Sequence, residues 1–361
     1  MTDQTHPITY FLGANSAQGF VSLYEQWIDQ GRAQAFYCIK GGAGCGKSTL
    51  MAGVAGNMEA RGYAVEYIRC SGDPDSLDGI AIPAKAAALM DGTAPHRMDP
   101  AYPGAAGHYV DLGAGYDRRA LFSLRKEVIA ATKRYQACYP QAYRRFRAAE
   151  ESLRRGRAPF CTEGTAEKVK KRAAALLEKE AGGGGAGQGR RTCRFLGGLT
   201  CRGRLLMEDT AAALCSRRYQ IKDDCGLADQ LLRELEAGFL AKGCDVIACP
   251  DPLSPDRLAH LLVPGRDAAF LTGPVTLPDC RTIRTETLTE KSVRQESRGL
   301  LRLSLRVAEE LIEEGIGYLA RAKAYHDELE ELYHPHVDFS LCVELTDRLT
   351  REILALPDVT D

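Results

Sequence analysis

One short motif constrains the fold of this chain more than any other feature of its sequence. Residues 41–48 read Gly-Gly-Ala-Gly-Cys-Gly-Lys-Ser and fit the pattern G-x-x-x-x-G-K-[ST]. The motif follows an apolar run at residues 35–39 that is typical of a buried strand, and it precedes a helix-forming run at residues 48–60. A strand, a glycine-rich loop and a helix in this order predict a parallel α/β sheet whose loop holds phosphate, the arrangement called a P-loop.

The motif supplies the groups that hold a nucleoside triphosphate. Backbone N–H groups of such a loop converge on the β-phosphate, and the following helix adds the positive end of its dipole. We expect Lys47 to reach the β- and γ-phosphate oxygens and Ser48 to ligate Mg²⁺. ATP and Mg²⁺ are the expected ligands, and the predicted nucleotide-binding residues are Gly41, Gly42, Ala43, Gly44, Cys45, Gly46, Lys47, Ser48 and Thr49.

Further residues are candidates for the chemistry at the bound phosphate, together with Lys47. Asp91 ends the apolar run at residues 86–90, which makes it the candidate Walker B carboxylate and second magnesium ligand; an aspartate that only closes a turn is the alternative. Asp75 follows an expected strand at the carboxyl edge of the sheet and is a candidate base. His96 follows Asp91 and is a candidate sensor of the γ-phosphate.

The chain divides into two related halves. The glycine-rich segment 181–190 is predicted to be a flexible linker. The tripeptide Phe-Leu-Gly at residues 11–13 recurs at residues 195–197, and later matches keep spacings that differ by two residues at most. We therefore expect an α/β protein with two P-loop-type parallel-sheet modules in tandem, residues 1–180 and 191–361, each with a long helical appendage.

The second half lacks the phosphate chemistry of the first. Aligning Lys40 with Lys222 places Asp229 opposite Lys47, so that a carboxylate stands where an ammonium should meet phosphate. This exchange adds repulsion and removes the neutralising charge. The sequence predicts one nucleotide site per chain, with the second half as a structural or regulatory pseudo-domain.

The segment from residue 70 to residue 113 resembles an uncharacterised bacterial family of tandem P-loop ATPase-like proteins. The resemblance is most specific at Asp91-Gly92-Thr93-Ala94-Pro95-His96 and extends over nearly the whole chain. It implies P-loop NTPase folds and ATP binding, but no established substrate. Members of that family carry a more complete second P-loop, and this sequence departs from them there.

Each half ends in a helical arm, and the two arms have opposite charge. In the first arm, about residues 117–180, the stretch 117–172 holds 16 Lys and Arg against six Asp and Glu. In the second arm, about residues 296–361, the stretch 307–361 holds four against 14. The matched excesses predict that the arms pack on each other or pair in a homodimer; a basic arm that binds nucleic acid is the alternative.

Both arms are predicted to be helical because apolar residues recur in them at helical spacing. Pro140, Pro335 and Pro357 are expected to kink or end these helices. The expected helices cover residues 121–155 and 166–180 in the first arm and residues 300–332 and 339–354 in the second.

The composition is that of a globular protein, with 45% hydrophobic and 26% charged residues. No run approaches the roughly 18 consecutive apolar residues of a membrane span, and the first residues do not read as a signal peptide. The 13 cysteines are odd in number and lack the C-x₂-C spacing of zinc sites, so we expect reduced thiols. These features predict a cytoplasmic protein without a membrane partner.

Three functions remain open from the sequence. The first is an ATP-dependent enzyme, most simply an ATPase, with Mg²⁺-ATP in the N-terminal half. The second is a nucleotide-dependent switch or scaffold with little turnover, and the third is a small-molecule kinase with Asp75 as base. Gly92 follows Asp91 where many mechanical ATPases have a glutamate, which argues against a motor.

Overall fold

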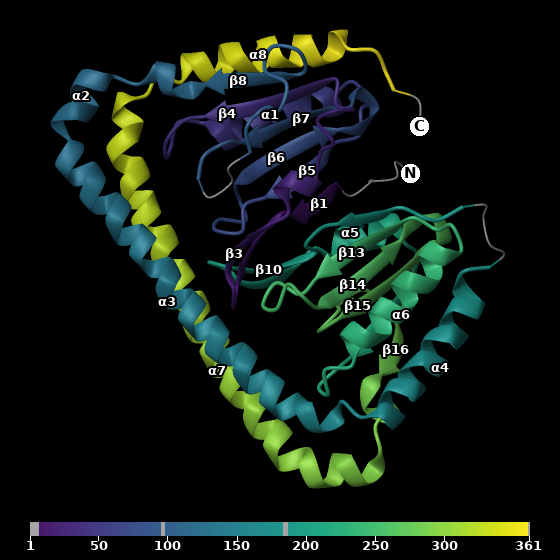
Figure 1. Ribbon diagram of the computed structural model, residues 1–361. Coiled ribbons are helices and arrows are strands. Elements are labelled where there is room, and N and C mark those ends of the chain that lie inside the picture. Colours follow the sequence, from purple (N-terminus) through teal and green to yellow (C-terminus); the bar gives the residue numbers. More distant parts are fainter. Residues whose placement is uncertain (1–6, 95–97, 183–186, 360–361) are drawn as a thin grey trace.

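Two six-stranded sheets form the centre of the structure, a computed structural model that describes residues 7–94, 98–182 and 187–359 (Figure 1). The first sheet has the order β1 (Ile8–Phe11), β5 (Glu66–Arg69), β6 (Leu77–Ile82), β7 (Ala87–Asp91), β4 (Ala35–Lys40) and β8 (Gly107–Asp111). The second has the order β9 (Arg191–Cys193), β13 (Val246–Pro250), β14 (Leu258–Val263), β15 (Ala268–Thr272), β12 (Arg217–Lys222) and β16 (Arg281–Arg284). Matched along the chain, the two orders are the same, so the α/β class and the internal repeat are confirmed.

The sheets are mainly parallel, as the sequence predicted, but each contains one antiparallel strand that was not predicted. β6 and β14 each run antiparallel to both of their neighbours. The tight turns that follow them have a residue with positive φ at the same place, Ala86 at 43° and Asp267 at 51°. Asp78 and Gly79 interrupt the apolar pattern of β6, which hid this strand; Asp78 is nevertheless buried, and it accepts a hydrogen bond from the Tyr24 hydroxyl (2.7 Å).

A helix follows the first loop of each half and packs on the sheet of that half. α1 (Lys47–Glu59) packs against β6, and α6 (Ala228–Ala241) packs against β14. α1 buries Leu50, Val54 and Met58 along one face. Such a repeat of apolar residues is what drives a helix onto a sheet, and it fixes the direction of the loop in front of the helix.

The helical arms cross from the half that carries them to the other half (Figure 1). α2 (Arg118–Ser123) and α3 (Arg125–Arg157) lead to α4 (Glu163–Glu180), which packs on α6 of the C-terminal half. α7 (Lys291–Tyr333) leads to α8 (Ser340–Ala355), which packs on α1 of the N-terminal half. Each half is therefore covered by the last helix of the other half's arm.

α3 and α7 lie side by side and antiparallel, which is the packing that their opposite charges predicted (Figure 1). Gly315 makes room for the ring of Phe146, since a Cβ on this glycine would lie 2.3 Å from a ring carbon. Arg134 pairs with Glu328 at 2.6 Å on the exposed side. The apolar core that the two helices share consists of Ala142, Phe146, Ala149, Ala308, Ile312, Ile316 and Leu319.

The two halves also meet near the start of each repeat. Phe11 and Phe195 exchange backbone hydrogen bonds of 2.9 and 3.0 Å. Because these residues hold the same place in the two repeats, the reciprocal contact is that of an approximate two-fold axis. The small elements around it are β2 (Gly13–Ser16), β3 (Gly19–Ser22), β10 (Gly197–Thr200), β11 (Gly203–Leu206) and α5 (Glu208–Leu214).

Two of the three expected proline boundaries hold. α7 ends before Pro335 and α8 ends before Pro357, but α3 continues through Pro140. A proline inside a helix removes one backbone hydrogen bond. Packing against α7 keeps α3 helical on both sides of Pro140, because Ala142 and Phe146 just beyond it are buried.

The predicted linker connects the two halves. α4 ends at Glu180 and β9 begins at Arg191, so the expected linker lies between them, and only part of it belongs to the described residues. All 13 cysteines are free thiols. Among the helices that the structure describes, none is both long and apolar enough to cross a bilayer.

Phe146→Ala is expected to lower the free energy of unfolding by about 3–5 kcal/mol, because it leaves a cavity between the arms. The side chain is fully buried, whereas Phe122 on α2 is 72% exposed and provides the matched control. Phe122→Ala should change stability by no more than about 0.5 kcal/mol. Guanidinium unfolding followed by circular dichroism measures both variants, and equal effects would contradict the described packing.

Candidate functional site

The loop between β4 and α1 is shaped by glycines in conformations that other residues rarely adopt. Gly44 has a φ of 64° and Gly46 a φ of 92°. Cys45 between them is buried and turns its sulfur back toward Gly41, where a Cβ would lie 2.4 Å from that sulfur. Gly46 has no side chain with which to cap α1. The first N–H groups of the helix therefore point at the loop with the positive end of the helix dipole behind them.

Lys47 bends back over this loop. Its ammonium donates hydrogen bonds to the carbonyl oxygens of Gly41 (3.1 Å) and Gly42 (2.7 Å). It also lies 3.7 Å from Oδ2 of Asp91, and both side chains are mostly buried, with 14% and 13% exposed. The two carbonyls fix the cation at the mouth of the loop, where it can meet a negatively charged ligand.

Asp91 and Ser48 offer oxygen ligands beside Lys47. β7 pairs with β4 so that Asp91 lies opposite Ile39, one residue before the loop strand ends. Oδ1 of Asp91 accepts hydrogen bonds from the N–H (2.8 Å) and the hydroxyl (2.5 Å) of Thr93. The Ser48 hydroxyl accepts the N–H of Leu77 (3.0 Å). Carboxylate and hydroxyl oxygens suit Mg²⁺, which prefers hard oxygen ligands, so this pair fits the predicted ion.

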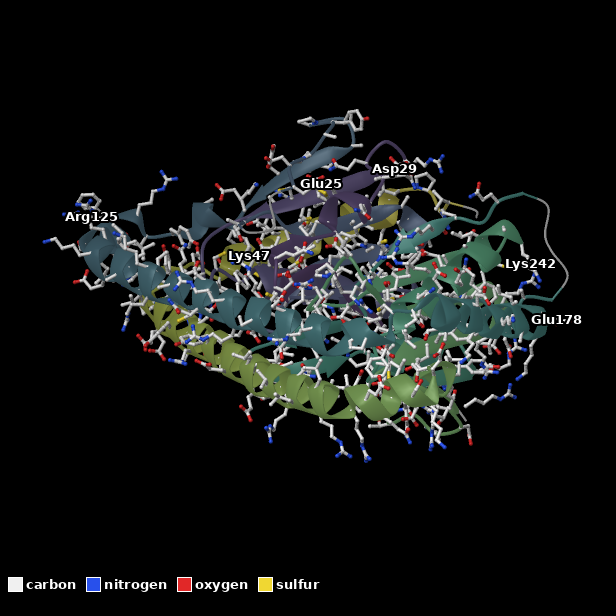
Figure 2. The ribbon with its side chains drawn as sticks, turned by 60° about the horizontal axis from the view of Figure 1, so that its bottom comes forward. Glu25, Asp29, Lys47, Arg125, Glu178 and Lys242 are labelled. Carbon is white, nitrogen blue, oxygen red and sulfur yellow. The ribbon has the colours of Figure 1, made fainter. Side chains whose placement is uncertain are left out.

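A cavity of about 860 Å³ lies between the loop and the two long helices, and Figure 2 shows Lys47 in this part of the molecule. One wall consists of the loop, Asp91 and Thr93. The opposite wall consists of one face of α3 and one face of α7. The residues of these two helices that line the cavity are Thr132, Tyr135, Gln136, Tyr139, Tyr143, Lys323, His326, Leu329, Glu330 and Tyr333.

The end of α7 covers the loop from the C-terminal half. A Cβ on Gly44 would lie 2.9 Å from the ring of His334 and 3.3 Å from Cβ of Glu330. From the N-terminal half, the Tyr116 hydroxyl accepts the N–H of Gly42 (2.6 Å). The loop is thus framed by residues from both halves of the chain.

This cover was not predicted from the sequence. The available signal was the row Lys323, His326, Glu330 and Tyr333, whose spacing places four polar side chains on one face of a helix. The spacing does not say which surface that face covers. Which surface it covers is set by the packing of each arm on the other half of the chain. That packing depends on contacts between residues far apart in the sequence.

The remaining candidates are placed differently. Asp75 does not line the cavity; its carboxylate forms an ion pair with Arg202 of the C-terminal half. Its neighbour Asp73 does line the cavity and lies 3.5 Å from the Lys323 ammonium. His96 lies outside the described residues.

The loop of the second half is one residue shorter than that of the first, which corrects the alignment. The N–H of Leu258 donates to Oδ1 of Asp229 (2.7 Å), as the N–H of Leu77 donates to Ser48 in the first half. Asp229 therefore stands in the place of Ser48, and Ala228, the first residue of α6, stands in the place of Lys47. The positive charge at the loop is still lost, because alanine stands where the first half has Lys47.

Asp223 fills the second loop with its own negative charge. Its carboxylate accepts the N–H groups of Leu227 (2.8 Å) and Ala228 (2.9 Å) and the Thr285 hydroxyl (2.6 Å). The two N–H groups lie at the start of α6, the kind of position where helices commonly bind anions. The carboxylate of Asp223 thus satisfies the N–H groups at the start of this helix.

One family matches part of the N-terminal half. It is described as Nephrocystin 3, N-terminal, and it matches residues 21–81. That stretch contains β4, the glycine-rich loop, α1, β5 and most of β6. No curated protein matches the chain, and no solved structure does.

Asp223→Ala is expected to lower the stability of the chain by about 1–3 kcal/mol, because it leaves buried N–H groups without an acceptor. The adjacent Asp224 is exposed, so Asp224→Ala is the matched control and should change stability by less than about 0.5 kcal/mol. Thermal unfolding measures both. Indistinguishable stabilities would contradict the role given to Asp223.

Proposed function

We propose that the chain binds one Mg²⁺-ATP at residues 41–49 and hydrolyses it, and that the C-terminal half is a structural and regulatory pseudo-domain. The observation that carries the proposal is the position of Lys47, held by two loop carbonyls beside Asp91 at the edge of the cavity. This assignment makes the chain a member of the tandem P-loop ATPase-like proteins that its sequence resembles. We also propose that the protein is cytoplasmic.

Each group has a defined role in this proposal. The loop N–H groups and the dipole of α1 hold the β-phosphate, and Lys47 neutralises charge on the β- and γ-phosphate oxygens. Ser48 and Asp91 would hold Mg²⁺, which supplies Lewis-acid stabilisation of the charge on the transferred phosphoryl group. In the second half, Ala228 and the carboxylate of Asp223 leave no such site.

Phosphoryl transfer to a small acceptor is the second candidate, because the cavity extends well beyond the loop. Its lining residues on α3 run from Thr132 to Tyr143, which is about 16 Å of helix. ATP breakdown that requires an added small molecule would favour this candidate. ATP binding without breakdown would favour a switch.

Lys47→Ala is expected to weaken ATP binding about 10- to 150-fold and to abolish detectable hydrolysis, because it removes charge-assisted hydrogen bonds worth about 1.5–3 kcal/mol. Calorimetric titration should give one ATP per wild-type chain. Lys222→Ala, at the exposed end of β12 in the other half, is the matched control and should leave both quantities unchanged. Two bound ATP per chain, or equal loss in both variants, would overturn the proposal.

Asp91→Asn is expected to raise the Mg²⁺ concentration needed for ATP hydrolysis about 10- to 100-fold. The amide oxygen still accepts the hydrogen bonds from Thr93, so the change removes the charge and keeps the local structure. Asp99→Asn is the control, since Asp99 is an exposed residue paired with Lys40. Hydrolysis measured across a Mg²⁺ titration tests both; an unchanged Mg²⁺ requirement for Asp91→Asn would contradict the assignment of this ligand.

A further inference from the structure

One face of α7 carries polar side chains of the C-terminal half into the cavity of the N-terminal half. Lys323, His326, Glu330 and Tyr333 all line the cavity, opposite the loop that holds Lys47. Gly92, next to Asp91, has no side chain with which to activate a water molecule. Among the described residues, the candidates for this task therefore lie on the other walls of the cavity.

His326 is held in place from two sides. The ring of Tyr135 on α3 packs edge-on against it, with ring centroids 5.4 Å apart and an angle of 82° between the planes. On α7 itself, Oε1 of Glu330 lies 3.7 Å from Nδ1 of His326. With Nδ1 beside the carboxylate, Nε2 is the nitrogen left to receive a proton.

The surroundings of this imidazole favour its neutral form. Burial lowers the pKa of His326 and is the largest cause of the shift; the facing charged groups are Glu330 and Asp327, which raise it, and Lys323 and Lys47, which lower it. Glu330, four residues after His326 on α7, lies against the loop, since a Cβ on Gly44 would lie 3.3 Å from its Cβ, and both residues line the cavity with Lys47. A neutral imidazole is the form that accepts a proton.

The same side chains are a poor site for a metal ion. His326, Asp327 and Glu330 bring ligand atoms within 4.8 Å of one another. However, the Lys323 ammonium forms an ion pair with Asp327 and also lies 3.5 Å from Asp73 of the N-terminal half. The ammonium of Lys323 therefore already neutralises carboxylate charge here, and its ion pair with Asp73 links α7 to the N-terminal half.

We propose that His326 is the general base for ATP hydrolysis at the loop of the N-terminal half and that Glu330 is its positioning residue. This inference rests on the function proposed above. The C-terminal half then has a direct part in the chemistry: it supplies the proton acceptor to a site that it cannot form itself.

A water oxygen forms a bond to the γ-phosphorus while the bond from that phosphorus to the β–γ bridging oxygen breaks. The water proton passes to Nε2 of His326, and the electron pair of the broken bond stays on the diphosphate, where Lys47 neutralises the charge. The imidazolium then returns its proton to the products or to solvent.

His326→Asn tests the inference, with ATP binding and ATP hydrolysis measured on the full chain. Loss of a general base is expected to lower the single-turnover rate about 100-fold or more, while ATP affinity stays within about threefold. Glu328→Gln is the control, because Glu328 lies on the same helix but pairs with Arg134 on the exposed side. It should leave both quantities unchanged.

Glu330→Gln tests the positioning role through the pH profile. Wild-type hydrolysis should fall as the pH drops below the pKa of His326, because the imidazole becomes protonated. Since Glu330 raises that pKa, its removal should lower the rate and move the acid limb to lower pH. In His326→Asn the residual rate should have no acid limb of this kind.

The failure of this inference is distinct from the failure of the proposed function. If His326→Asn hydrolyses ATP at a rate within threefold of wild type, and this hydrolysis depends on Lys47, then His326 is not the general base. The proposed ATPase function would still stand. ATP binding by wild type without hydrolysis would also overturn the inference about His326. Absence of ATP binding to the wild-type chain would overturn the proposed function itself.

Discussion

The antiparallel packing of α3 on α7 is the interaction on which the rest of the structure depends. Ion pairs such as Arg145–Glu314 (2.8 Å) are partly exposed to solvent and contribute little each, whereas burial of Phe146 contributes far more. The apolar seam therefore supplies the stability, and the opposite charges select the partner and the register. The same pair places α4 on one half and α8 on the other. Its faces toward the loop also form one wall of the cavity.

The repeat uses one scaffold in two opposite ways. In the N-terminal half the glycine-rich loop ends in a cation, Lys47, and opens on a cavity. In the C-terminal half the same strand order ends in Ala228, and Asp223 occupies the N–H groups at the start of the helix. The arm of the second half covers the loop of the first half, where Glu330 and His334 lie against Gly44.

The features that could be predicted are those fixed by short stretches of sequence. The motif at residues 41–48 determines a strand, a loop and a helix locally, and the opposite charges of the arms indicate their contact. β6 was hidden because Asp78 is buried through a hydrogen bond to Tyr24 that no pattern reveals. The packing of each arm on the other half, which also places His326, depends on contacts between distant residues. The alignment at Asp229 was shifted because the second loop is one residue shorter than the first.

We propose that one chain forms one nucleotide site from both of its halves. Hydrogen–deuterium exchange of the full chain with and without Mg²⁺-ATP tests it most directly. The account predicts slower exchange in two distant segments, the loop at residues 41–49 and the part of α7 from Lys323 to Tyr333, with no change at residues 223–228. Slower exchange at both loops, or at the first loop without α7, would contradict it.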